Sequence, residues 1–357
     1  MKSKLLKLLP LVLFSLAASG YSETTPAAQP SGSCYDQGHP VQASQMASGY
    51  NSPARIDVEG AWDFYLTGSF IYWQARMDGL SVGTYAFTPP THPGRVLNPE
   101  FEFKPGFKVG IGMNSSFDNW NVYAEYTWIR DEMHTRHSVP LASTISGSQV
   151  AFWNSNATSF TSVRSNWEHS NNILDLSLGR AYYVGTRLTF LPFVGTRAYW
   201  MDQDFHVSYA DSTVSPATHA RTSSDADSWA IGARTGVQTS WLLGHDFRLI
   251  GNVAGSLAYQ KFNADLHVHN TTGAVTANFH SHHGQITPNV EGAVGLGWGS
   301  YFASHEWHFD FAALYEFHYF WNQNANRALA QEATATRASG SGDLMYQGLT
   351  LTARLDF

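Results

Sequence analysis

The sequence predicts an all-β fold, a closed antiparallel transmembrane β-barrel of about ten strands, on three observations. The last residues, 344–357, alternate apolar and polar side chains with the period of a β-strand and stop on a terminal Phe. Beyond the N-terminal segment, no apolar run reaches the length of about 18 residues that a membrane-spanning helix needs. Aromatic residues are nevertheless abundant, with 12 Trp, 17 Tyr and 22 Phe among 357 residues. This combination is typical of a barrel with a polar interior and aromatic girdles.

The N-terminus predicts export. Lys2, Lys4 and Lys7 precede the apolar run 5–18, and small residues at 18–20 offer a cleavage site, so residues 1–20 are expected to be a signal peptide. Residues 21–55, rich in Ser, Gly, Pro, Gln and Ala, are expected to be a flexible periplasmic lead-in, and residues 56–357 the barrel. The single cysteine, Cys34, cannot form an internal disulfide, so it is either free or bonded to another chain.

Ten segments carry the alternation or the aromatic and β-branched content of strands. A hairpin hidden in residues 148–160 would raise the count to twelve. After the signal peptide, no helix of useful length is apparent. The predicted strands are residues 62–76, 103–113, 120–130, 171–184, 188–201, 229–240, 247–260, 285–298, 307–321 and 344–357.

The connections between these strands alternate in length. Short turns are expected near residues 115–119, 185–187, 241–246 and 299–306, and long polar loops at 77–99, 131–168, 202–227, 261–284 and 322–342. Short periplasmic turns and long extracellular loops are the rule for bacterial outer-membrane barrels. Along 307–321 every second residue is apolar and almost all of these are aromatic, which predicts a lipid-facing side.

Several blocks of the chain closely resemble one family. They are FYLTGSFIYWQARMDGLSVG (64–83), NPEFEFKPGFKVGIG (98–112), WNVYAEYTWIR (120–130), LTFLPFVGTRAYWMDQ (188–203), the segment 229–262 and the terminal strand. Together they are similar to the Legionella-type major outer membrane protein family, which also occurs in chlamydia-related bacteria. The resemblance implies a pore-forming barrel in the bacterial outer membrane. It also implies disulfide cross-linking at the surface, which a single cysteine does not support.

A porin-like role, the passive diffusion of small hydrophilic solutes or ions, would depend on charged side chains that point into the lumen. Both signs occur, so the sequence does not predict selectivity. Two alternatives remain open: the charges pair as a structural ladder across a plugged lumen, or the barrel is a non-conducting surface-display protein or adhesin. The alternation predicts the following pore-lining residues: Lys108, Glu125, Asp175, Arg197, Arg234, Arg248, Glu291, Asp310, Glu316 and Arg354.

Two further sites are weaker candidates. An omptin-like rim protease would use acidic and Asp-x-His groups, and Asp202, Asp204 and His206 stand at the exit of the fifth predicted strand. A second acidic pair for the opposite wall is not evident, and an Asp-Gln-Asp at the mouth of a loop is more often turn chemistry, so we expect no enzyme activity and no cofactor. Two His-x-His pairs in the predicted loop 261–284 could converge on zinc or copper, or form a pH-sensitive lid. The weak metal candidates are His267, His269, His280 and His282.

The expected partners follow from the location. A net charge of −7 argues against nucleic acid. Outer-membrane lipid and lipopolysaccharide should surround the barrel, and the barrel assembly machinery should read Phe357 as its signal. Association into a homo-oligomer is a further expectation.

Overall fold

The computed structural model describes residues 56, 58, 63–86, 93–115, 120–139, 149–184, 186–213, 218–303, 305–334 and 342–357. These residues belong to one compact unit, 51–357. The predicted signal peptide (1–20), almost all of the predicted lead-in (21–55) and Cys34 lie outside the described residues and stay predictions.

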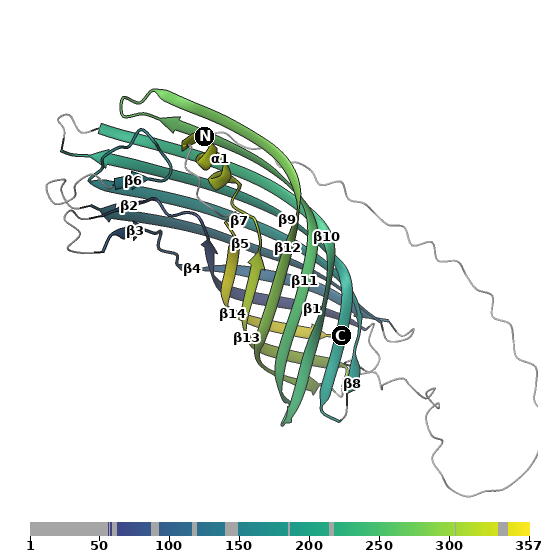
Figure 1. Ribbon diagram of the computed structural model, residues 1–357. Coiled ribbons are helices and arrows are strands. Elements are labelled where there is room, and N and C mark those ends of the chain that lie inside the picture. The colour runs from purple at the N-terminus through teal and green to yellow at the C-terminus, as the bar shows by residue number, and fades with distance from the viewer. Residues whose placement is uncertain are drawn as a thin grey trace, which may run out of the picture. The chain divides into compact units, whose positions relative to one another are not determined.

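Ten antiparallel strands form a closed barrel, which confirms the predicted fold class (Figure 1). Each strand pairs with the next in chain order, and the last pairs with the first. The wall strands are β1 (Phe64–Met77), β4 (Phe103–Asn114), β5 (Trp120–Ser138), β7 (Ser162–Arg180), β9 (Leu188–Asp211), β10 (Thr218–Gly244), β11 (Phe247–His269), β12 (Val275–Phe302), β13 (Trp307–Phe320) and β14 (Leu344–Asp356).

Strands β14 and β1 close the wall. They pair from Tyr65 opposite Asp356 to Met77 opposite Leu344. Beyond this ladder, the Phe64 amide donates to the Phe357 carbonyl at 3.2 Å and the Phe357 amide returns a bond of 3.0 Å. Closure removes the unpaired edges that would otherwise be unsatisfied inside a bilayer.

The lipid-facing side predicted for β13 is confirmed, because the odd-numbered side chains from Trp307 to Tyr319 face outward and the even-numbered ones face inward. On β13 itself Phe311 is 43% exposed, and outward apolar side chains continue on the neighbouring β12, where Val294 is 58% exposed. Three tryptophans mark one limit of this band: Trp128, Trp200 and Trp229. Trp128 and Trp200 both lie opposite Asn172, and Trp229 lies opposite Trp200. We call these three the outer rim.

Three predicted long loops are wrong, because most of 202–227 and 261–284 is strand, and β5 and β7 extend into 131–168 at its two ends. Beyond the outer rim the alternation inverts: on β9 the side chains of Phe205, Val207 and Tyr209 are buried inside, whereas Asp204 and His206 are exposed outside. A polar exterior is what a wall in water requires. Strands β7 and β9 to β12 therefore continue past the outer rim, and Figure 1 shows these strands extending beyond β13 and β14.

The short turns lie at the end that holds the barrel's own termini, which we call periplasmic. One of them joins β10 to β11, where His245 and Asp246 have positive φ angles of 51° and 65°. Positive φ at both central residues gives the turn the twist that suits an antiparallel hairpin. The short strand β8 (Tyr182–Val184) follows β7 at this end and pairs with β9.

The opposite end carries the remaining elements. Strands β2 (Gly83–Tyr85), β3 (Arg95–Leu97) and β6 (Gln149–Ala151) form a small separate sheet. The described part of 148–160 contains β6 and no hairpin, so the wall count stays at ten. A helix that the sequence did not predict, α1 (Ala325–Thr334), packs against β10 to β12. Within the described ranges, no helix is long and apolar enough to cross a membrane.

Candidate functional site

The membrane-spanning part of the lumen is lined by ion pairs. Lys108 on β4 donates to Glu316 on β13 at 2.7 Å and lies 3.9 Å from Glu125 on β5. The Lys108 ammonium also stands over the Trp73 ring, 4.9 Å from its centroid. These contacts span the barrel interior, because β4 and β13 are separated in the wall by β1 and β14.

A second cluster surrounds Arg197, which is almost fully buried. Its Nε and Nη2 atoms donate to the two carboxylate oxygens of Asp175, each at 2.6 Å. Nη2 also donates to Glu291 at 2.6 Å, and Nη1 donates to Asn289 at 2.8 Å. Arg234 donates to the other oxygen of Glu291 and lies 4.0 Å from Asp175. The two guanidinium groups thus share two carboxylates.

His318 joins the two clusters. Its Nδ1 lies 3.1 Å from Glu291 and its Nε2 lies 3.4 Å from Glu316, while its ring packs at 4.8 Å from the Trp73 ring. Sequence analysis did not single out His318. The sequence could have placed His318 inside the barrel, because it has an even position on β13, like Glu316. Alternation predicts which side of the wall a residue faces, but it does not predict which residues it contacts.

A third group lies near the periplasmic end. Arg354 donates to Asp356 at 3.0 Å, and His308 lies 3.1 Å from the same carboxylate. Arg248 pairs with Asp310. With these contacts, each of the ten predicted lumen residues lies on the inner side of the wall and takes part in an ion pair.

Toward the outer rim, uncharged polar side chains replace the ion pairs in the lumen. The Tyr199 hydroxyl donates to Gln260 and lies 2.9 Å from both Gln260 and Thr287, and the amides of Gln260 and Gln323 bond to each other at 3.0 Å. This uncharged polar layer separates the ion pairs from an apolar interior. The apolar interior includes Trp153, Phe160, Trp167, Phe205, Phe262 and Phe320, all at most 1% exposed.

Two segments that do not belong to the wall complete this apolar layer, residues 152–160 and α1, and together we call them the plug. Asn154 Nδ2 donates to the carbonyls of Arg221 at 3.1 Å and His269 at 2.9 Å. Ser224 on β10 donates to Asn326 of α1 at 2.8 Å, and Arg327 of α1 joins the two plug segments by donating to the Phe152 carbonyl at 2.9 Å. The plug is therefore attached to the inner wall by hydrogen bonds as well as by packing.

Solvent exposure of the ion-paired side chains is graded along the lumen. The side chains of Glu125, Arg248 and Arg354 are 20% to 24% exposed, whereas that of Arg197 is 2% exposed. Water therefore reaches Glu125 and the pairs near the periplasmic end, whereas Arg197 is enclosed by its partners.

The candidate protease residues lie elsewhere. Asp202, Asp204 and His206 point away from the lumen, onto the outer wall beyond the outer rim. Asp204 faces Asp225 across the β9–β10 pair. Partial desolvation by the groups around it on this surface, together with the neighbouring Asp225 carboxyl, raises the pKa of Asp204 to about 6. These side chains therefore do not line the barrel interior.

The candidate metal ligands are also on the outer wall, in strands rather than in a loop. His267 and His269 lie on β11, and His280 and His282 on β12. His280 Nδ1 lies 2.8 Å from Asp265. Among the residues that the structure describes, no group of three or more His, Cys, Asp or Glu side chains could hold a metal ion.

Phe357, the predicted assembly signal, ends the closing strand. Its ring lies 5.7 Å from the Trp307 ring at the periplasmic end. Its backbone is held by Phe64, so the terminal residue is part of the seam.

The closed barrel, its apolar exterior and its ion-paired lumen define an outer-membrane β-barrel protein. The chain belongs to the family of the Legionella pneumophila major outer membrane protein precursor, whose model matches residues 57–357. This confirms the predicted family and places the protein in the bacterial outer membrane.

Solved structures of other barrels are similar at low identity. The outer membrane protease OmpT from Escherichia coli is 9% identical, with 82% of this chain and 96% of that chain covered and a TM-score of 0.39. A major outer membrane protein from Thermus thermophilus is 10% identical, with 82% and 99% covered and a TM-score of 0.29. The Pseudomonas putida toluene transporter TodX is 9% identical, with 82% and 89% covered and a TM-score of 0.32. No curated protein matches. At these values neither proteolysis nor transport carries over to this chain.

Proposed function

We propose that this protein is a narrow outer-membrane channel for small hydrophilic solutes or ions, which the plug closes in the state described here. The observation that carries the proposal is the charged inner wall of the membrane-spanning part. Burying charges costs several kcal/mol per ion unless they are well paired, and apolar side chains often fill such space at no loss of stability. The same barrel does fill its outer part with apolar side chains.

The ion pairs would line the conducting path and set its preference. Carboxylates and guanidinium groups on the inner wall fix the local potential that a passing ion meets. Glu316 and Glu291 lie on opposite sides of His318, and they pair with Lys108 and Arg197, so this level of the lumen contains charges of both signs. Conduction would then require the plug, and not the wall, to move.

Conductance in planar bilayers tests the proposal. Refolded wild-type protein should give rare, small steps, and Arg327→Ala should raise their frequency because it removes the bond from α1 to Phe152. Thr272→Ala, in the exposed β11–β12 turn, is the matched control and should match the wild type. A heat-modifiability gel shows that each barrel has folded.

Ion preference gives the second readout. Glu316→Gln should shift the reversal potential toward anions, because it leaves Lys108 without its nearest counter-charge. Silence from folded wild-type and Arg327→Ala barrels would reject the channel. So would steps whose reversal potential ignores the Glu316 substitution.

A second candidate, a non-conducting surface-display barrel, is favoured by one observation. The plug side chains Trp153 and Asn154 are fully buried, so the outer part of the barrel is packed as a stable core. In this case the long strands would present a surface to the outside, and the silent result above would be the expected one. We infer no enzyme activity, because the candidate acidic residues face the outer wall.

Assembly and association complete the proposal. We propose that the assembly machinery recognises the closing strand and Phe357, and Phe357→Ser should then slow insertion while leaving the refolded barrel intact. Homo-oligomers remain a proposal that the mass of the detergent-solubilised protein tests.

A further inference from the structure

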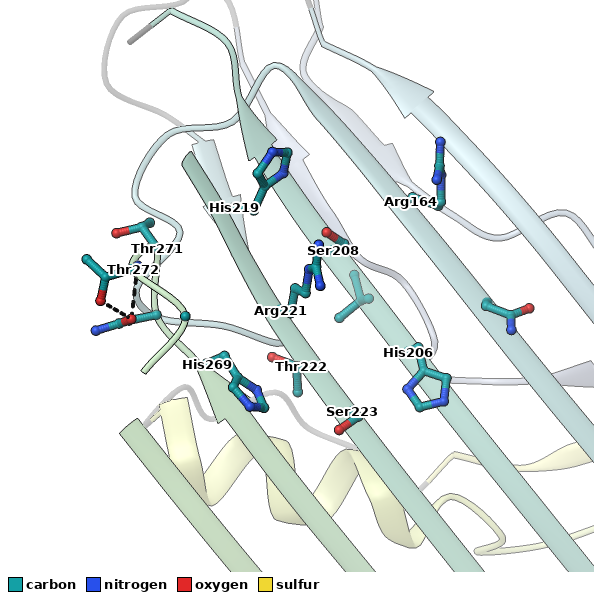
Figure 2. Close-up of a pocket in the computed structure, with 14 residues that line it drawn as sticks. Arg164, His206, Ser208, His219, Arg221, Thr222, Ser223, His269, Thr271 and Thr272 are labelled. Carbon is teal, nitrogen blue, oxygen red and sulfur yellow. Dashed lines mark hydrogen bonds between the residues drawn. The ribbon is translucent and has the colours of Figure 1, made fainter. Parts of the chain in front are cut away.

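A groove of about 640 Å³ lies on the outer wall beyond the outer rim, where β7, β9, β10 and β11 run side by side (Figure 2). Outward side chains of these strands line it, and the β11–β12 turn borders it with residues 270–273. Figure 2 shows Arg221 close to Ser208 with His219 and His269 on either side of it, and Arg164 two strands away. The groove opens sideways from the wall and not into the lumen.

The charged side chains that line the groove are all basic or histidine. Arg164 and Arg221 both pair in register with Ser208, from opposite sides of β9, and Arg221 is also opposite His269. Arg136 on β5 continues this row next to Arg164. Within the ranges that the structure describes, none of the three arginines has an ion-pair partner. We call this set the basic row.

Acidic side chains form a separate row closer to the membrane. Glu168, Asp204, Asp225 and Asp265 are cross-strand neighbours on β7, β9, β10 and β11. They lie four residues along each strand from the basic row, a distance of roughly 13 Å. An anion is therefore attracted to the basic row and repelled from the level below it, which fixes the height at which it can bind.

The height of the basic row selects the kind of ligand. From Trp229 in the outer rim to Arg221 the chain runs about 26 Å along β10, and the usual strand tilt reduces this to roughly 20 Å above the rim. The polar head groups of ordinary phospholipids occupy only about 5 to 7 Å beyond the hydrocarbon core. A lipid whose anionic groups reach the basic row must therefore have an extended sugar head group.

We propose that the groove binds the anionic head-group sugars of a glycolipid in the outer leaflet. The groove faces sideways on a wall that continues the lipid-facing surface, so the molecules packed against it are the heads of neighbouring lipids. Arg164 and Arg221 bind the phosphate or carboxylate groups, since a guanidinium offers paired donors to such groups. Hydroxyl groups of Ser208, Ser223 and Thr271 are placed to bond the sugar.

The test uses the full barrel in phosphatidylcholine vesicles with purified lipopolysaccharide as the probe, in the presence of a chelator that removes bridging divalent cations. Lipopolysaccharide retained per barrel after detergent extraction is measured by native mass spectrometry. Arg164→Gln/Arg221→Gln should lower the affinity at least about tenfold, since it removes the charge-assisted hydrogen bonds of both guanidinium groups. Arg76→Gln, an exposed arginine on β1, is the matched control and should not change it.

Two further arms separate the alternatives. Arg164→Lys/Arg221→Lys keeps the charge and loses the paired donors, so its affinity should lie between those of the wild type and the Gln variant. Deacylated lipopolysaccharide sugar, added in solution, should bind far more weakly than the intact lipid. Equal capture of the soluble sugar would assign the groove to a soluble anion and overturn the proposal, as would unchanged retention in a folded Gln variant. The readout is independent of conductance, so it stands whether or not the barrel is a channel.

Discussion

Replacing Arg197 by Met is the strongest single test of the lumen network. The substitution keeps the side-chain stem and removes a guanidinium that bonds Asp175, Glu291 and Asn289 at 2.6 to 2.8 Å. Breaking a buried ion pair from one side costs about 3 to 5 kcal/mol, because the remaining charge is buried without compensation. Arg234 remains beside both carboxylates, so we expect the lower end, about 3 kcal/mol.

The assay is equilibrium unfolding in urea of the barrel in lipid vesicles, followed by Trp fluorescence. Arg130→Met is the matched control: Arg130 also pairs with a carboxylate, at 3.6 Å from Glu168, but its side chain is 61% exposed. Exposed pairs contribute at most about 1 kcal/mol, so the control should change little.

A partner substitution completes the cycle. Asp175→Asn in the Arg197→Met background should recover part of the lost stability, because it removes the carboxylate that loses both of its guanidinium hydrogen bonds, whereas Glu291 still accepts from Arg234. Equal costs for the Arg197 and Arg130 substitutions, or no recovery in the double variant, would refute the idea that Arg197 compensates buried charge.

Three further predictions concern other parts of the wall. Val294→Arg, at an outward position midway along the lipid-facing band, should cost about 2 to 4 kcal/mol in the same unfolding assay, and Phe311→Arg, opposite Trp298 near the periplasmic end, should cost less. Asp204→Asn should stabilise the barrel at neutral pH. The folded-state pKa of Asp204 is raised to about 6, so the protonated carboxyl favours the folded state. The stability that this group gives the wild type is therefore lost as pH rises from about 4 to 6. The difference between the urea midpoints of the variant and the wild type should shrink as pH falls through the same window. Asn154→Ala should make the plug sensitive to protease while the heat-modifiability gel stays unchanged, since two wall carbonyls lose a donor at a cost of about 1 to 3 kcal/mol.

The membrane-spanning part of the fold was predictable because its pattern is simple. Along β13 every outward residue is apolar and most are aromatic, so strand, face and approximate limits could be read from the sequence. The inward direction of Lys108 and Glu316 followed from the same alternation. Their pairing did not, because it depends on side chains that cross a lumen between strands distant in the chain.

The substitution Glu316→Arg shows what this difference means. From alternation alone, Glu316 is a solvated lumen residue whose replacement should affect only ion preference. In the structure it is 6% exposed and bonded to Lys108, so arginine there would place two cations together in a buried site. Glu316→Gln is therefore the variant to use for selectivity.

The outer halves of the long strands were missed for a physical reason. Within the bilayer, alternate side chains of a wall strand are apolar on the outside of the barrel and polar on the inside. In water the same alternation places polar side chains outside and apolar side chains inside. Residues 202–211 therefore look like a polar loop to a search for lipid-facing strands, although Phe205, Val207 and Tyr209 alternate regularly. The position where the pattern changes sign, at Trp200 on β9 and Trp229 on β10, is the outer boundary of the membrane-spanning part.

This change of sign explains why the barrel has a plug. Beyond the outer rim the wall is a sheet in water, and its apolar inner face must be covered by another layer. Residues 152–160 and α1 supply that layer, as Trp153 and Ala330 show by their complete burial. Moving the plug would expose this face to water, so any open state of the lumen must be less stable than the closed one. The ion pairs around Arg197 lie in the membrane-spanning part and do not belong to this apolar layer. Displacing the plug therefore leaves these pairs in place, and the membrane-spanning part can stay folded.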